Sequence, residues 1–180
     1  MQSLLTSEEK QLLLEIGREA VVASVTAGGK IPRTIKQANL LAKRGCFVCI
    51  KINGALRGCI GNFTADTPLY QQVQEMAAAA ATRDPRFYPM KPSDLTDFQL
   101  EISVLSPLQK ISSPETIKVG LHGVYIEKNF SRGVLLPQVA MEQGWDRETF
   151  LRQTCLKAGL DENSWMEGAT ISVFTAEVFS

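Results

Sequence analysis

The dipeptide Asn53-Gly54 constrains the fold of this chain more than any other sequence feature. The segment before it, residues 46–52, is apolar and rich in β-prone side chains, and residues 55–60 after it have the same character. Asn-Gly between two such segments is the strongest short signal for a two-residue β-hairpin, because both central residues of the turn adopt positive φ. The sequence therefore predicts an antiparallel hairpin in the first half of the chain.

Further helices and strands are predicted around this hairpin. An amphipathic helix over residues 7–25 begins with a capping box of Thr6 and Glu9 and ends at Gly28-Gly29. Hairpins between helices, without regular βαβ alternation, favour an antiparallel α+β fold. The other predicted elements are a short helix at 37–42, a helix capped by Asp66 or Thr67 and stopped by Asp84-Pro85, a strand at 98–104, a hairpin of 121–127 with 133–136, a helix at 147–158 capped by Asp146, and a final strand at 171–178.

Length and charge limit the kind of protein this is. With 180 residues, the chain is expected to form one domain over 1–180. Lys plus Arg equals Asp plus Glu at 19 each, so there is no bulk positive charge to attract nucleic acid or an anionic membrane. No apolar run approaches the roughly 20 residues of a membrane span, and the first residues do not form a signal peptide. A cytoplasmic protein with four reduced thiols is therefore expected.

The segment Leu56-Arg57-Gly58-Cys59-Ile60-Gly61 is the strongest candidate for chemistry. Strand alternation predicts that Arg57 and Cys59 share a face, where the guanidinium would favour the thiolate. Gly58 and Gly61 would either admit a ligand against the backbone or serve a bulge or close packing. Cys59 is thus a candidate nucleophile, with Arg57, Gly58 and Gly61 as candidate ligand-binding residues. The alternative is a small buried cysteine beside an arginine that pairs with an acid.

Two further residues are candidates for proton transfer. Glu101 lies on the polar side of the predicted strand 98–104, where burial would raise its pKa or pair it with Arg57. His122 is the single histidine of the chain and titrates near neutrality, although a lone histidine is more often a structural residue. A thiol nucleophile normally needs a base, and the motif around Cys59 contains none.

The remaining cysteines do not form a metal site. Cys46 and Cys49 have a Cys-x-x-Cys spacing, but residues three apart on a strand point to opposite faces and cannot share a metal ion. Cys46 and Cys59 are predicted to lie diagonally on one hairpin face, too far apart for a disulfide. Cys155 is predicted to be a core residue of its helix, and no metal and no cofactor are expected.

Other polar residues are candidates for binding a small anionic ligand. Arg83 and Arg86 follow the helix that ends at Asp84-Pro85, and their guanidinium groups match carboxylate or phosphate. A structural role is equally compatible, because cations are favoured near a helix C-terminus and Asp84 can cap the following turn. Gln138, after Pro137, would either present its amide to a ligand or cap a helix.

Five separated motifs follow one another along nearly the whole chain. They are residues 56–61, residues 83–87 with Pro89, residues 101–106, residues 133–140 and residues 155–160. Taken together, they resemble one known family, the AMMECR-type domain, called protein A of the AmmeMemoRadiSam system. Cys49 departs from the resemblance, because the family usually has a hydroxyl or small residue there.

The resemblance implies a compact α+β fold with an antiparallel sheet, in which a larger and a smaller subdomain, interleaved in sequence, surround a cleft near the Arg-Gly-Cys-Ile-Gly motif. It also implies association with a Memo-like protein and a radical SAM protein. Two functions follow as hypotheses. One is an enzyme subunit with Cys59 as reactive thiol, and the other is a non-catalytic binding or scaffold module for those partners. A nuclear nucleic-acid-binding role is disfavoured by the neutral charge.

Overall fold

The computed structural model describes residues 4–28 and 32–180, so Gly29 of the predicted helix stop lies outside the described residues. The chain divides into two compact units. The first comprises the described residues up to Leu105 together with Glu177–Ser180, and the second comprises Ser106–Ala176. Both contain an antiparallel sheet with helices, which confirms the predicted α+β class.

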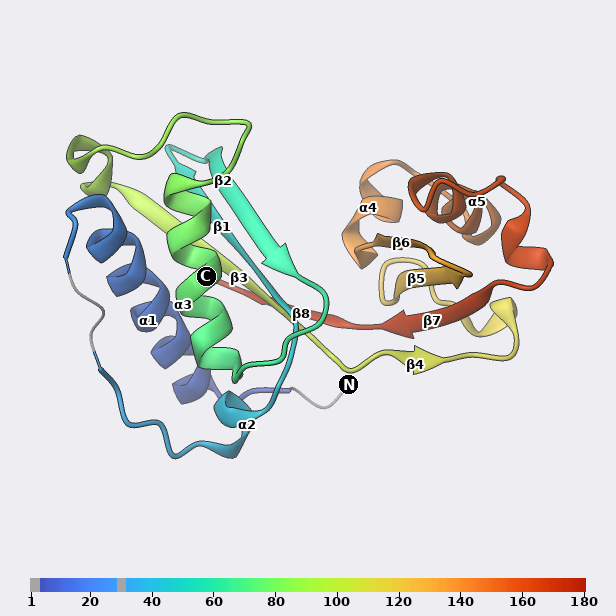
Figure 1. The fold of residues 1–180 in the computed structure, drawn as a ribbon, viewed down its shortest axis with the longest axis horizontal. Helices are drawn as coiled ribbons and strands as arrows, with labels where there is room; N and C mark the ends of the chain where they lie inside the picture. Colours follow the sequence, from blue (N-terminus) through green and yellow to red (C-terminus); the bar gives the residue numbers. More distant parts are fainter. Residues whose placement is uncertain (1–3, 29–31) are drawn as a thin grey trace. The chain divides into compact units, whose positions relative to one another are not determined.

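In the first unit, a four-stranded sheet has the order β2-β1-β3-β8 and is covered on one face by helices α1 and α3, which run side by side (Figure 1). Strand β1 is central and β2 forms an edge. The elements are α1 Ser7–Val25, α2 Ala38–Leu41, β1 Cys46–Ile52, β2 Ala55–Asn62, α3 Leu69–Thr82, the 3₁₀ helix η1 Pro92–Leu95, β3 Phe98–Leu105 and β8 Ala176–Phe179.

The predicted turn and helix starts are largely confirmed. Asn53 and Gly54 both have positive φ, as a tight hairpin turn requires. Thr6 and Glu9 form the complete capping box of α1. The predicted cap of α3 is wrong, because the helix begins at Leu69 with Pro68 at the N-cap position and no capping side chain. The hydroxyl of Thr67 instead accepts a hydrogen bond from Gln72 Nε2 at 2.6 Å.

The core of the first unit lies between the helices and the sheet. Alternate residues of β1, namely Cys46, Val48 and Ile50, are fully buried there. The α3 residues Leu69, Val73, Met76 and Ala80 are buried in the same cluster. The intervening β1 residues are only half-buried. The sheet therefore has one face in the core and an opposite face that is half-buried and partly polar.

The second unit has its own sheet, of order β4-β7-β5-β6, and its own core. Asp146 caps α5 by accepting a hydrogen bond from the Thr149 amide at 2.8 Å, as predicted. The elements are β4 Gln109–Lys110, the 3₁₀ helix η2 Pro114–Thr116, β5 Gly123–Lys128, β6 Ser131–Leu135, α4 Pro137–Glu142, α5 Arg147–Lys157, the 3₁₀ helix η3 Ser164–Met166 and β7 Thr170–Phe174.

The prediction of one final strand is wrong, because this segment forms two strands. The segment divides into β7, which belongs to the second sheet, and β8, which belongs to the first. The division falls at Thr175, whose carbonyl accepts from the Ser106 amide and whose amide donates to the Ser106 hydroxyl, both at 2.9 Å. These bonds replace the sheet hydrogen bonds at that residue, so a continuous β-prone segment contributes to two sheets.

Candidate functional site

The candidate site is the part of the β1–β2 hairpin that contains the Arg-Gly-Cys-Ile-Gly motif. The turn pairs Ile52 with Ala55 and Lys51 with Leu56. If this register continued unchanged, Cys59 would lie opposite Val48, on the core face. The register instead shifts between Ile50 and Lys51, so that Arg57 is an extra residue on β2. Such a bulge reverses the face of every later residue of the strand.

The bulge brings Cys59 directly opposite Cys49, with their Cα atoms 4.0 Å apart, and their sulfurs form a disulfide. Two predictions are therefore wrong. Cys49 and Cys59 are not reduced thiols in this structure, and Cys59 does not share a face with Cys46, which pairs with Asn62. The physical reason for both is the single extra residue in β2.

The other two cysteines are free and fully buried. Burial raises the pKa of Cys46 to about 12 and also raises the pKa of Cys155, so neither is an activated thiol. The core position predicted for Cys155 is confirmed. Cys46 lies in the core while Cys49 lies on the half-buried face, which confirms that the two sulfurs cannot share a metal ion.

Asp84 and Arg86 bind the backbone of Cys59 from the open edge of β2. Asp84 Oδ2 accepts a hydrogen bond from the Cys59 amide at 2.8 Å, and Arg86 Nη2 donates to the Cys59 carbonyl at 3.1 Å. Arg86 also donates to the Asp84 carboxylate through Nε at 3.0 Å and Nη2 at 2.7 Å. We call this arrangement the Asp84–Arg86 clamp. Because both polar groups of Cys59 point away from β1, Cys49 and Cys59 form a non-hydrogen-bonded pair, the closer kind in antiparallel sheets.

The carboxylate of the clamp is deeply buried and ionised. Only 1% of the Asp84 side chain is exposed, whereas 56% of the Arg86 side chain is. Hydrogen bonds from the Arg86 side chain hold the pKa of Asp84 well below its usual value of 3.8. The amides of Cys59 and Arg86 lower this pKa further, while burial opposes the shift. The hydrogen bond that the Arg86 backbone amide donates to Asp84 confirms that Asp84 caps the turn after α3.

This lowered pKa predicts how stability depends on pH. In the unfolded chain, the Asp84 carboxylate takes up a proton near its usual pKa. In the folded protein, it takes up a proton only at lower pH. The stabilisation is therefore complete above about pH 4 and is lost as the pH falls through the folded-state pKa. In Arg86→Ala, the pKa of folded Asp84 should rise towards its usual value, so the acid-dependent loss of stability should be smaller and should end at a higher pH. Urea unfolding from about pH 7 to about pH 2 measures this, and parallel profiles for the two proteins would contradict it.

Both glycines of the motif are required by close packing. A Cβ at Gly58 would overlap the carbonyl oxygen of Ala80 and lie 3.0 Å from its carbonyl carbon, because α3 crosses β2 at this point. A Cβ at Gly61 would overlap the ring of Phe47. Of the two readings of these glycines, close packing is the one that these contacts support.

Glu101 does not pair with Arg57, which was one of the two alternatives predicted for it. Arg57 Nη2 lies 3.3 Å from Asp94 Oδ2 in η1, and Lys51 Nζ lies 2.8 Å from Glu101 Oε2 across β1 and β3. The bulge also interrupts the alternation that predicted Arg57 beside Cys59. Neither ion pair is deeply buried, since each side chain is between 21% and 36% exposed.

The other predicted residues lie elsewhere. Arg83 is exposed at the end of α3 and lines a groove of about 830 Å³ with Tyr70 and Gln74. His122 and Gln138 belong to the second unit. His122 Nδ1 accepts from the Lys118 amide at 3.3 Å, and burial and the nearby Lys118 charge lower its pKa. Gln138 is an exposed residue in the first turn of α4.

The structure thus brings Gly58, Cys59, Gly61 and Arg86 together around β2. Sequence reasoning missed Cys49, Lys51, Asp84 and Asp94 as parts of this arrangement. Only Asp84 had a signal in the sequence, because it lies between two arginines next to a helix-stopping proline.

Two features are absent from the part of the chain that the structure describes. No three His, Cys, Asp or Glu side chains within residues 4–28 and 32–180 are grouped so that they could hold a metal ion. In the same ranges, no helix combines the length and the apolar character that crossing a membrane requires.

Comparison with known proteins identifies the family. The AMMECR1 family model matches residues 14–179. Protein MK0488 of Methanopyrus kandleri is 41% identical over 189 residues, covering 99% of this chain and 91% of its own. Protein MJ0810 of Methanocaldococcus jannaschii is 41% identical over 185 residues, and the match covers 98% of this chain and 92% of that protein. The crystal structure of the uncharacterized protein PH0010 from Pyrococcus horikoshii matches with a TM-score of 0.85 at 36% identity, covering 98% of this chain and 93% of that one. The chain belongs to the AMMECR1 family.

Proposed function

We propose that this protein is a non-catalytic binding module of an AmmeMemoRadiSam-type enzyme system, with a Memo-like protein and a radical SAM protein as its partners. The observation that carries the proposal is the engagement of Cys59. Its sulfur is bonded to Cys49, and its amide and carbonyl are bonded to the Asp84–Arg86 clamp. In this structure, the sulfur and both backbone polar groups of Cys59 are therefore engaged within the protein, and none of them is left free for a substrate.

The competing hypothesis, an enzyme subunit with Cys59 as nucleophile, requires a free thiolate and a base. In the disulfide form that this structure shows, Cys59 has no free thiolate. Of the two proposed proton-transfer residues, Glu101 is paired with Lys51. His122 accepts a hydrogen bond from a backbone amide of its own unit. These bonds favour the binding-module hypothesis over the enzyme hypothesis.

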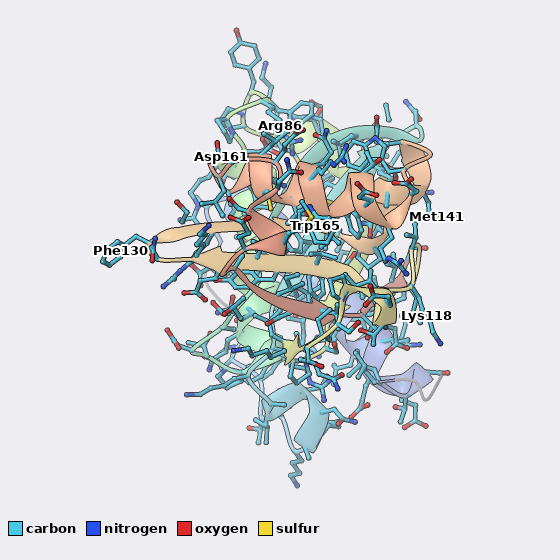
Figure 2. All side chains as sticks on the ribbon, turned by 90° about the vertical axis from the view of Figure 1, so that its right-hand side faces the viewer. Arg86, Lys118, Phe130, Met141, Asp161 and Trp165 are labelled. Atoms are coloured by element: carbon cyan, nitrogen blue, oxygen red, sulfur yellow. A yellow bond between two sulfur atoms is a disulfide. The ribbon has the colours of Figure 1, made fainter. Side chains whose placement is uncertain are left out.

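A binding module needs accessible side chains that can anchor a partner. Phe130 projects from the tip of the β5–β6 hairpin, where the whole side chain is exposed (Figure 2). Tyr88 is 88% exposed in the segment that follows the Asp84–Arg86 clamp. Aromatic residues dominate the binding energy of protein interfaces, whereas exposed aromatic rings contribute little to the stability of a free protein. Phe130 and Tyr88 are therefore the side chains to test.

Partner binding should respond to these exposed residues and not to the motif cysteine. Phe130→Ala or Tyr88→Ala should weaken binding to a Memo-like or radical SAM partner by about tenfold or more, as expected when an interface anchor is truncated. Cys59→Ser should change it by less than about twofold, because the clamp holds the backbone of residue 59. Isothermal titration of each purified partner measures both effects.

Two outcomes would contradict the proposal. One is the failure of either partner to bind the unaltered protein at any concentration tested. The other is a loss of binding in Cys59→Ser while that variant keeps the circular dichroism spectrum and unfolding midpoint of the unaltered protein.

A further inference from the structure

We infer that Cys49 and Cys59 form a reversible dithiol–disulfide site that exchanges with a low-molecular-weight thiol–disulfide couple. The inference depends on the geometry of β1 and β2, and it is independent of the proposed partners. It concerns a pair that exists in this chain because the bulge at Arg57 sets Cys59 opposite Cys49.

The pair is aligned by contacts that do not involve the sulfur–sulfur bond. Cys49 lies in the central strand β1, which pairs with β2 on one side and with β3 on the other. Cys59 is fixed from its other side by the Asp84–Arg86 clamp. Both backbones are therefore held in place whether or not the sulfurs are joined, and the reduced thiols remain positioned to form the bond again.

The bond is also not needed to close the hairpin. The stabilisation from a disulfide grows with the length of the loop it closes. Cys49 and Cys59 are only 10 positions apart in the sequence, and the Asn53-Gly54 turn already brings the two strands side by side. Reduction should therefore leave the hairpin folded, and this is the property expected of a switching site rather than of a structural cross-link.

Access distinguishes this pair from the other cysteines. Cys49 and Cys59 are half-buried on the sheet face opposite the core, whereas Cys46 and Cys155 are fully buried. Glu101 lies across from Cys49 on β3, and its charge is balanced by Lys51 at 2.8 Å. An external thiol or disulfide can therefore reach the pair without meeting an unbalanced charge, while the core thiols stay protected.

The chemistry is two successive exchanges. The thiolate of one cysteine attacks a sulfur of the small disulfide R–S–S–R, forming a mixed disulfide and releasing one thiolate, which takes a proton from water. The thiolate of the second cysteine then attacks the sulfur of the first and displaces the second small thiolate. The protein dithiol is oxidised and loses two electrons and two protons, and R–S–S–R is reduced to two R–SH. The reverse sequence returns the protein to the dithiol.

The test is a redox titration of the full chain in mixtures of reduced and oxidised glutathione, followed by acid quenching, alkylation and peptide mass spectrometry. The unaltered protein should pass from four alkylated cysteines to two, with a midpoint inside the titrated range of glutathione ratios. The two protected residues should be Cys49 and Cys59. Cys46, on the same strand but facing the core, is the internal control and should be alkylated after denaturation at every ratio.

The single variants test the two-step chemistry. Cys49→Ser and Cys59→Ser should each accumulate one glutathione on the remaining partner cysteine, because the resolving thiol is missing. Four alkylated cysteines at the most oxidising ratio would overturn the inference. Protection of Cys49 and Cys59 that persists at the most reducing ratio would also overturn it, because the bond would then be a permanent cross-link. A cross-link that includes Cys46 would overturn the bulged register itself.

Discussion

Asp84→Ala should lower the free energy of unfolding by about 3 kcal/mol, an unusually large effect for a single polar residue. The carboxylate is 1% exposed and accepts hydrogen bonds from the Arg86 side chain and from the amides of Cys59 and Arg86. Removing it leaves the Cys59 amide without its acceptor at the edge of the sheet. Urea denaturation at neutral pH, followed by circular dichroism, measures the change.

Asp94→Ala is the matched control for this prediction. Like Asp84, Asp94 pairs with an arginine, here Arg57, and accepts a hydrogen bond from a backbone amide, here that of Lys91. Its side chain is 28% exposed, so solvent can replace the lost bonds and the expected loss is about 1 kcal/mol or less. Equal losses in the two variants would show that burial of the Asp84 carboxylate is not what makes the clamp strong.

Gly58→Ala should be comparably destabilising, at about 3 kcal/mol or more, for a steric reason. The added methyl group would overlap the Ala80 carbonyl oxygen, which belongs to the backbone of α3 and cannot rotate away. Either α3 or β2 would have to move, and both are packed in the core of the first unit. Thermal and urea unfolding of the variant measure the effect.

Gly28→Ala is the control for Gly58. A Cβ at Gly28 would meet its nearest neighbours at 3.5 Å, an ordinary contact, so the change in unfolding free energy should stay within about 0.5 kcal/mol. If Gly58→Ala were as harmless as this control, the close approach of β2 to α3 would not exist in solution.

Much of the fold could be predicted from local signals. The capping box at Thr6, the Asn53-Gly54 turn, the strand predicted at 98–104 and the Asp146 cap each depend on a few neighbouring residues of the chain, and each is confirmed. The single final strand was wrong because its division depends on Ser106, which is 69 residues away in the sequence. Local propensity gives no information about such a partner.

The candidate site was less predictable for a similar reason. The bulge adds one residue to β2 and is invisible in the hydrophobic pattern, yet it decides which cysteine faces Cys59. The face of β2 on which Cys59 lies was therefore wrongly predicted, and so were the residues beside it. The contact of Asp84 with β2 was missed because the Cys59 amide, from which Asp84 accepts a hydrogen bond, is 25 residues away in the sequence.

The structure also gives a physical account of four of the five separated motifs that carry the family resemblance. Within the first unit, residues 56–61 are bound by residues 83–87 through the Asp84–Arg86 clamp. Within the second unit, a Cβ at Gly133 would lie 2.5 Å from the Thr154 carbonyl oxygen and 2.7 Å from Ala158 Cβ, so residues 133–140 pack against residues 155–160. In each pair, one motif lies on a strand and the other contacts it. Asp84 and Arg86 hydrogen-bond to the backbone of Cys59, and Ala158 packs against Gly133.

Amide hydrogen exchange at Cys59 reports whether the Asp84–Arg86 clamp holds the Arg-Gly-Cys-Ile-Gly motif in solution. An amide that points outward from an edge strand normally exchanges quickly. Because Asp84 accepts this bond, we expect the Cys59 amide to exchange as slowly as the amides of central strand β1, and to become fast in Asp84→Ala. Fast exchange at Cys59 in the unaltered protein would contradict the account.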